Sequence, residues 1–156
     1  MEIFPDGIVA TVRQIQVHNE NAERSGIGRR TAINLHDVSK ESLRRGQCAG
    51  APGSLFPTDR LDARLHVLKS HARDLKNKSR VRLHLGTDEV ISRVVMLDRD
   101  NLAPGDVTLV QFVLEAPSVA LPKDRFVIRT FSPVQTIGGG VILDSRPARH
   151  KRFDSE

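Results

Sequence analysis

The clearest chemical feature of this chain is a cluster of cations in its middle. Eight Lys or Arg residues lie between Arg60 and Arg82, against only two carboxylates there, Asp62 and Asp74. The whole chain has a net charge of +5 and a sequence pI of about 10.0. Clustered cations of this kind suit the phosphate backbone of a nucleic acid. A solubilising surface would carry the same charges, so both interpretations stay open at this point.

Side chains that could bind a metal or carry out catalysis are scattered. The six histidines form no H-x-x-x-H or H-E-x-x-H pair. His66 and His84, which we expect to face each other on adjacent strands, would supply only two ligands. The single cysteine, Cys48, excludes an internal disulfide, and we expect it to be a small buried apolar residue. No nucleophile motif accompanies the serines, so we predict no catalytic residue, no metal site and no enzymatic activity.

Composition sets broader limits. Hydrophobic residues make up 38% of the chain and charged residues 28%, which is enough for a core and for solubility. Aromatic residues make up only 4%, so we do not expect stacking platforms for single-stranded nucleic acid. No apolar run approaches the roughly 18 residues of a membrane span, and no signal peptide opens the chain. We therefore expect a cytoplasmic protein without a membrane partner.

Alternating apolar and polar residues predict short strands through the second part of the chain. The expected strands are Leu61–Leu68, Arg80–Leu85, Glu89–Leu97, Val107–Leu114, Phe126–Thr130 and Val141–Leu143. Six short strands separated by turn signals favour a small closed β-barrel. The glycines at 138–140 predict a tight turn or close backbone packing. They lack the Lys-Ser/Thr of a phosphate-binding P-loop.

The first part of the chain also carries strand signals. Ile8–Val17 and Gly28–Leu35 predict strands, and a slip of phase at Arg13 and Gln14 predicts a bulge in the first. One turn of helix is expected within Val38–Gly46. The Gly- and Pro-rich stretch that follows, residues 50–57, is the best candidate for a linker.

Several of these segments carry ordered motifs. Val12–His18 reads V-R-Q-I-Q-V-H, Gly28–Leu35 reads G-R-R-T-A-I-N-L, and Pro104–Asp106 reads P-G-D. The hairpin Arg125–Asp144 then carries a basic residue at each end of an apolar strand, a polar loop and three glycines. In this order they resemble domains II and III of SelB, the selenocysteine-specific elongation factors of the elongation factor Tu-like GTPases.

The resemblance implies an all-β chain with two small β-barrel lobes of the translation-factor domain II/III type. Residues 1–56 would be the C-terminal part of a domain II-like barrel, which is therefore incomplete. Residues 57–144 would be a domain III-like barrel. Residues 145–156 form a basic tail that is poor in apolar residues, so we expect it to be loose. The family's GTPase domain, which binds GTP and Mg, has no counterpart here, so no cofactor is expected in this chain.

The resemblance also assigns site residues. Arg30 falls on the Arg of the family's G-x-R-x-A-L-N motif and would face the ionised selenol in an aminoacyl pocket; a surface Arg on a strand edge is the alternative. The loops His71–Lys78 and Thr130–Thr136 would contact the T arm of the tRNA. The phosphate and ribose contacts expected from these loops are Arg73, Lys76, Lys78, Ser132 and Gln135.

The function implied is to hold selenocysteyl-tRNA for decoding of UGA on the ribosome, together with the GTPase domain of the parent protein. Two alternatives belong to other classes. The chain could be an interaction module that docks on a separate GTPase domain, or a remnant that forms homo-oligomers through exposed domain II edges. Salt discriminates them, since tRNA binding weakens steeply as salt rises and apolar docking does not.

Overall fold

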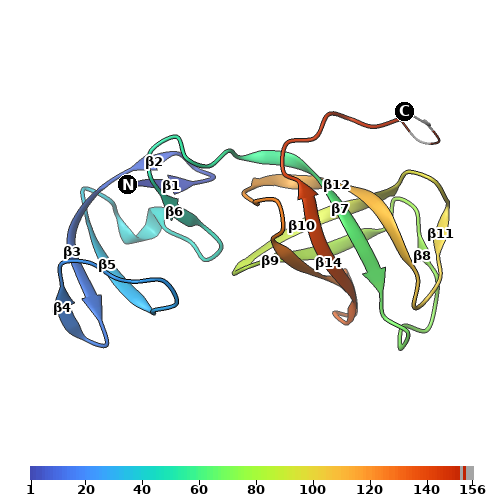
Figure 1. Ribbon diagram of the computed structural model, residues 1–156, viewed down its shortest axis with the longest axis horizontal. Coiled ribbons are helices and arrows are strands. Elements are labelled where there is room, and N and C mark those ends of the chain that lie inside the picture. The colour runs from blue at the N-terminus through green and yellow to red at the C-terminus, as the bar shows by residue number, and fades with distance from the viewer. Residues whose placement is uncertain (152, 154–156) are drawn as a thin grey trace. The chain divides into compact units, whose positions relative to one another are not determined.

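The computed structural model describes residues 1–151 and 153 (Figure 1). Within this part the chain is all-β apart from one 3₁₀ turn, which confirms the predicted fold class. It divides into two compact units, Met1–Leu55 and Phe56–Glu156.

The second unit is a closed antiparallel barrel with the strand order β10-β12-β7-β14-β13-β9. Its strands are β7 Thr58–Val67, β9 Arg80–Leu85, β10 Asp88–Met96, β12 Val107–Ser118, β13 Arg125–Thr130 and β14 Thr136–Asp144. A small sheet of β8 (Leu75–Lys76) and β11 (Asn101–Leu102) accompanies it. Five of the barrel strands were predicted close to their observed bounds, because a half-buried strand exposes every second side chain. The sixth, β14, was predicted only over Val141–Leu143.

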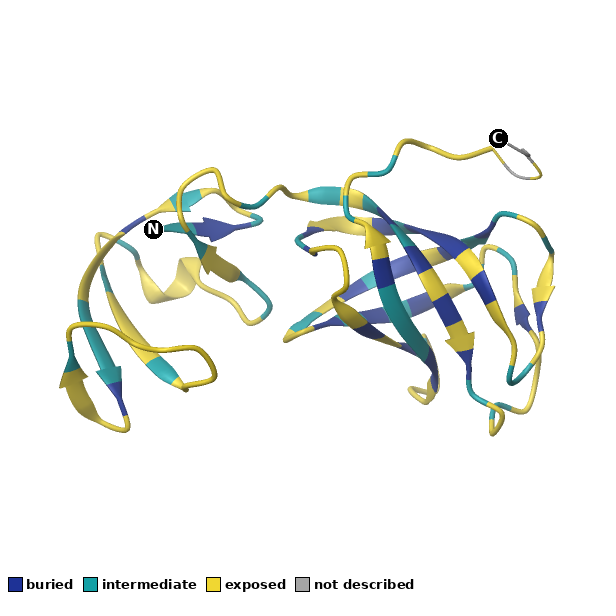
Figure 2. Cartoon of the chain, viewed as in Figure 1, coloured by how far each residue is buried: buried dark blue, intermediate teal, exposed yellow. Residues whose placement is uncertain are grey.

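The barrel is filled by the inward-facing residues of its strands. Buried and exposed residues alternate along β7, β9 and β10 (Figure 2). Phe112 and Phe126 meet edge-to-face near the centre, with ring centroids 5.1 Å apart. Aliphatic side chains supply the rest of the core, as the low aromatic content requires.

The three glycines lie inside β14, so a tight turn there was a wrong prediction and close backbone packing a correct one. A Cβ on Gly138 would stand 2.5 Å from the carbonyl oxygen of His66, and one on Gly139 would stand 2.7 Å from that of Phe126. Because glycine has no Cβ, the backbone of β14 can approach both neighbouring strands, β7 and β13. The strand therefore begins at Thr136 rather than at Val141.

The first unit consists of two three-stranded sheets, ordered β2-β1-β6 and β4-β3-β5. The strands are β1 Glu2–Phe4, β2 Ile8–Val9, β3 Thr11–Val17, β4 Glu20–Ala22, β5 Thr31–His36 and β6 Cys48–Gly50. The register of β3 against β5 shifts between Val12 and Gln14, which confirms the predicted bulge. The predicted helical turn is the 3₁₀ turn η1, Lys40–Ser42. Both sheets are open, so each keeps two edge strands.

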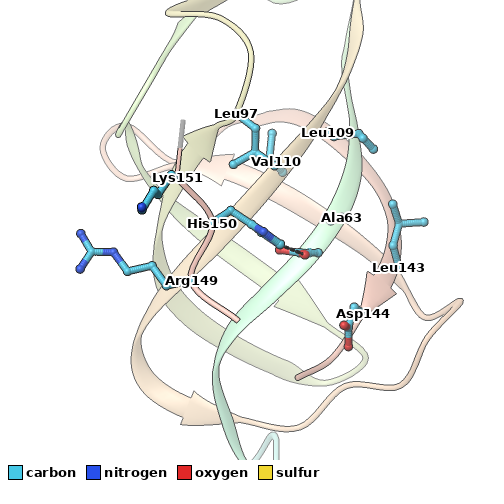
Figure 3. A pocket seen from close by; sticks show the side chains of 10 residues that line it. Ala63, Leu97, Leu109, Val110, Leu143, Asp144, Arg149, His150 and Lys151 are labelled. Carbon is cyan, nitrogen blue, oxygen red and sulfur yellow. Dashed lines mark hydrogen bonds and ion pairs between the residues drawn. The ribbon is translucent and has the colours of Figure 1, made fainter. Parts of the chain in front are cut away.

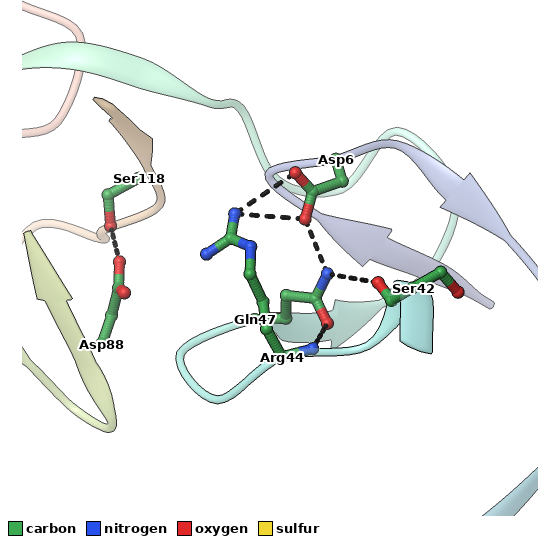
Figure 4. A network of polar contacts seen from close by, with 6 residues as sticks. All are labelled: Asp6, Ser42, Arg44, Gln47, Asp88 and Ser118. Atoms are coloured by element: carbon green, nitrogen blue, oxygen red, sulfur yellow. Dashed lines mark hydrogen bonds and ion pairs between the residues drawn. The ribbon is translucent and has the colours of Figure 1, made fainter. Parts of the chain in front are cut away.

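A polar network ties the β1–β2 turn to the segment before β6 (Figure 4). Arg44 donates to both carboxylate oxygens of Asp6 at 3.2 Å, and Gln47 donates to one of them at 2.6 Å. The hydrogen bond from Gln47 is the first cause of a lowered pKa for Asp6. In the barrel unit, buried Ser118 similarly donates to Asp88 at 2.6 Å.

Three further expectations were wrong. Cys48 is exposed rather than buried, because it lies on β6, an edge strand. His66 pairs with β12 and β14, and His84 with β10 and β13, so the two do not face each other. The segment after β14 is not loose over residues 145–151, since it makes hydrogen bonds to the barrel; the predicted tail at 152 and 154–156 lies outside the described residues.

Candidate nucleic-acid interface

Two loops that are far apart in the sequence line one groove of the barrel unit. The loop between β7 and β9 and the loop between β13 and β14 both contribute to a groove of about 670 Å³. Both loops were expected to contact RNA. Arg73, Ser132 and Gln135 are among the residues that line the groove, and all three are exposed. The floor is formed by the buried apolar residues Leu75, Val81 and Ile137.

Lys76 and Lys78 do not line this groove. Lys76 belongs to β8 and pairs with Asn101 of β11. Lys78 has a φ of 63°, and its backbone N–H donates to the carbonyl of Val94 at 2.7 Å. This turn carries both lysines to the small β8–β11 sheet, where their side chains are exposed.

The loop between β13 and β14 is held from inside by Thr130. The backbone N–H of Gln135 donates to Thr130 Oγ1 at 2.9 Å, and the N–H of Thr130 donates to the carbonyl of Gln135 at 2.8 Å. Thr130 Oγ1 also donates to the carbonyl of Pro133. These bonds fix the ends of the segment that presents Ser132 and Gln135.

Phe131 lines the groove, and two arginines lie over its ring. Phe131 was not singled out from the sequence. The guanidinium of Arg80 lies 4.4 Å from the ring centroid and that of Arg82 lies 5.2 Å away. Arg82 also donates to the carbonyl of Phe131 at 3.3 Å. The available signal was an apolar residue directly after a strand that has a basic residue near each of its ends, Arg125 and Arg129.

Carboxylates on the outer face of the barrel hold these two arginines. Arg80 makes a bidentate pair with Glu115 at 2.7 and 2.6 Å, and Arg82 pairs with Glu89. The hydrogen bond from the paired arginine is the largest cause of a lowered pKa for each of these glutamates. Both arginines that contact the Phe131 ring are therefore already paired with a carboxylate. Arg73, by contrast, lines the groove and has no ion pair among the described residues.

Arg30 is exposed in the first unit and lies directly before β5, outside the strand in which it was expected. A neighbouring hollow over β3 and β5 is lined by Gln14, Gln16 and Asn34, and Arg30 is not part of it. Within the described residues no group of three or more His, Cys, Asp or Glu could hold a metal. No helix among them is long and apolar enough to cross a membrane.

Comparison with known proteins bears on the barrel directly. The family model described as the selenocysteine-specific elongation factor β-barrel domain matches residues 62–149, which is most of the closed barrel. The chain belongs to this family. The matched domain is a β-barrel, and the chain contains no P-loop sequence of a GTPase.

Relatives agree with this placement. The chain is 35% identical to the selenocysteine-specific elongation factor of Desulfomicrobium baculatum over 100% of its own length and 25% of that protein. For the factor from Haemophilus influenzae the identity is 26%, over 92% of the chain and 23% of the protein. Elongation factor 1-alpha of Ignicoccus hospitalis is 29% identical over 94% of the chain and 37% of its own length. The chain thus spans about a quarter of the selenocysteine-specific factors it matches.

Proposed function

We propose that this chain holds selenocysteyl-tRNA within a translation elongation factor, with the barrel groove on the T arm and the first unit at the aminoacyl end. In this proposal residues 1–56 correspond to part of domain II and residues 57–144 to domain III. We propose further that it acts in the cytoplasm, together with a GTPase domain, in the decoding of UGA on the ribosome.

The observation that carries the proposal is the convergence of the two loops on one groove. The loops supply a cation, Arg73, beside a hydroxyl and an amide, Ser132 and Gln135. Cations neutralise phosphates, while hydroxyl and amide groups bond phosphate and ribose oxygens. Such a site reads the shape of an RNA helix rather than its sequence.

Arg30 has a separate place in the proposal. It is exposed and shows no ion pair among the described residues, so its charge is available to an anionic group. An ionised selenol at the end of a charged tRNA is such a group, and a fixed cation is what it requires.

The test is binding of the purified chain to an unmodified selenocysteine tRNA transcript and to a bulk elongator tRNA at two salt concentrations. Arg73→Gln should weaken binding and reduce its salt dependence, whereas Lys123→Gln, an exposed cation outside the groove, should not. A preference for selenocysteine tRNA would support this tRNA as the substrate. Absence of binding at low salt would overturn the proposal for this chain.

One observation favours docking on a protein as a second function. Arg82 and Arg129 lie directly opposite each other on β9 and β13, and Glu89 is the carboxylate that pairs with Arg82. Arg129 Nε is buried without a hydrogen-bond partner. Glu89 therefore faces two arginines, and an acidic group on a protein such as a GTPase domain would add a second carboxylate at the half-buried Arg129 side chain, beside exposed Val127. Binding of the chain to a separately purified GTPase domain that resists salt, but is lost in Val127→Asp, would support docking.

The open sheet edges of the first unit could also pair with a second copy of the chain, which would form a homo-oligomer. Sedimentation at rising chain concentration tests this alternative.

A further inference from the structure

The segment after β14 is a strap that crosses the outside of the barrel. Asp144 Oδ1 accepts the backbone N–H of Arg146 at 2.8 Å, and the Arg146 guanidinium lies 4.3 Å above the ring of Phe56. Beyond the strap, the backbone N–H of Phe153 donates to the carbonyl of Leu97, directly after β10, at 2.8 Å. The strap, residues 145–151, is therefore attached to the barrel at its start, and the chain is attached again at Phe153.

A buried amide fixes the middle of the strap. Gln111 points outward from β12, yet it is only 2% exposed because the strap covers it. Its Nε2 donates to Asp62 Oδ1 and to the carbonyl of Ala148, both at 2.9 Å. His150 Nε2 lies 2.5 Å from Asp62 Oδ2, and the carboxylate accepts a hydrogen bond from the ring N–H. We call Gln111, Asp62 and His150 the latch.

The latch decides where the neighbouring cations point. His150 is directed toward Asp62, and Figure 3 shows Arg149 and Lys151 directed to the opposite side. Both are exposed, and neither has an ion pair among the described residues. Carboxylates border the hollow beneath the strap at Asp62 and Asp144.

The lysines that do not line the groove are connected to the same end of the barrel. Asn77, between Lys76 and Lys78, accepts the backbone N–H of Met96 through its Oδ1 at 2.9 Å. The next residue, Leu97, accepts the N–H of Phe153. The lysine turn and Phe153, just beyond the strap, are thus held by two consecutive residues at the end of β10 and directly after it.

We propose that the strap and the lysine turn form a second phosphate-binding surface, separate from the groove. Its cations are Lys76, Lys78, Arg149 and Lys151, and its partner is the backbone of a structured RNA. The inference rests on the proposed function for the class of partner, because exposed cations without counter-ions favour a polyanion in general. The latch residues act as positioning residues, since they hold the strap without facing the partner.

The experiment measures RNA binding of the full chain across a salt series, with the selenocysteine tRNA transcript as the probe. Arg149→Gln with Lys151→Gln should reduce the slope of log affinity against log salt by about 1 to 2, since each neutralised phosphate contributes nearly one unit. Lys123→Gln with Arg125→Gln removes the same charge from two exposed residues, at a turn and at the start of β13, outside both surfaces, and should leave the slope unchanged. The latch variant Gln111→Leu keeps every charge and should lower affinity while the slope stays close to that of the parent chain.

The outcomes separate the two proposals. A strap pair that binds like the control pair, while Arg73→Gln binds weakly, would overturn the second surface and leave the groove in place. Weak binding of the strap pair with normal binding of Arg73→Gln would support the strap and count against the groove. No binding by the parent chain would overturn both. Faster hydrogen exchange at residues 146–150 in Gln111→Leu would show that the latch holds the strap, and unchanged exchange would overturn its positioning role.

Discussion

Gly140 of β14 faces the backbone of Arg64 on β7 so closely that a Cβ at position 140 would stand 1.9 Å from the Arg64 carbonyl oxygen. No side-chain rotation can relieve this contact, since the position of a Cβ is fixed by its own backbone and the carbonyl oxygen belongs to the backbone of Arg64. Gly140→Ala should therefore separate β14 from β7 and destabilise the barrel by about 3 kcal/mol or more, at the upper end of overpacking effects. Chemical denaturation monitored by circular dichroism would measure the loss. Gly26→Ala, where an added Cβ meets open space, should change stability little; equal stability of the two variants would contradict the contact.

Thr130 should control RNA binding without touching the RNA. Thr130→Val removes the hydroxyl that accepts the N–H of Gln135 and donates to Pro133, so the loop should lose its fixed shape. A lost hydrogen bond of this kind costs about 1 kcal/mol, so affinity should fall about fivefold. Thr130→Ser keeps the hydroxyl and should retain binding. A Val variant as tight as the Ser variant would show that the loop does not depend on this side chain.

The pair of Glu89 with Arg82 should contribute stability that depends on pH. The Arg82 hydrogen bond lowers the pKa of Glu89 from 4.5, so the contribution is present above this value and is lost as pH falls through the folded-state pKa. The difference in Tm between the parent chain and Glu89→Gln should therefore shrink below about pH 4.5, where Glu is ordinarily protonated. Since the pair is partly exposed, we expect at most about 1 kcal/mol. A difference in Tm that does not change with pH would contradict this contribution.

Phe112 should be the most sensitive residue of the core. Its side chain is 0% exposed and meets Phe126 edge-to-face inside the barrel. Phe112→Ala should cost about 3 to 5 kcal/mol, because the closed sheet cannot collapse into the cavity. Phe112→Leu keeps most of the volume and should cost clearly less. A similar cost for both variants in denaturant titrations would mean that the aromatic contact, rather than the volume, dominates.

Some residues of the candidate site could be named from the sequence, but how they come together could not. Arg73, Ser132 and Gln135 were named from motifs and do line one groove, although their role in binding stays a prediction. Lys76 and Lys78 were named with them but lie with the β8–β11 sheet, because Lys78 takes a left-handed φ that turns the chain. Phe131 carried no motif, and its two arginine neighbours come from another strand.

By itself the sequence determined most of the local structure: five barrel strands and the last part of β14, the bulge near Arg13 and the helical turn around Lys40. These follow from side-chain alternation and turn residues, which depend only on neighbours along the chain. Tertiary structure decided which backbones touch, as at Gly140 and Arg64, which loops share a groove, and where the strap runs. The physical reason is that barrel closure and register set the neighbours across strands, and a distant residue such as Gln111 meets Ala148 only after both are fixed.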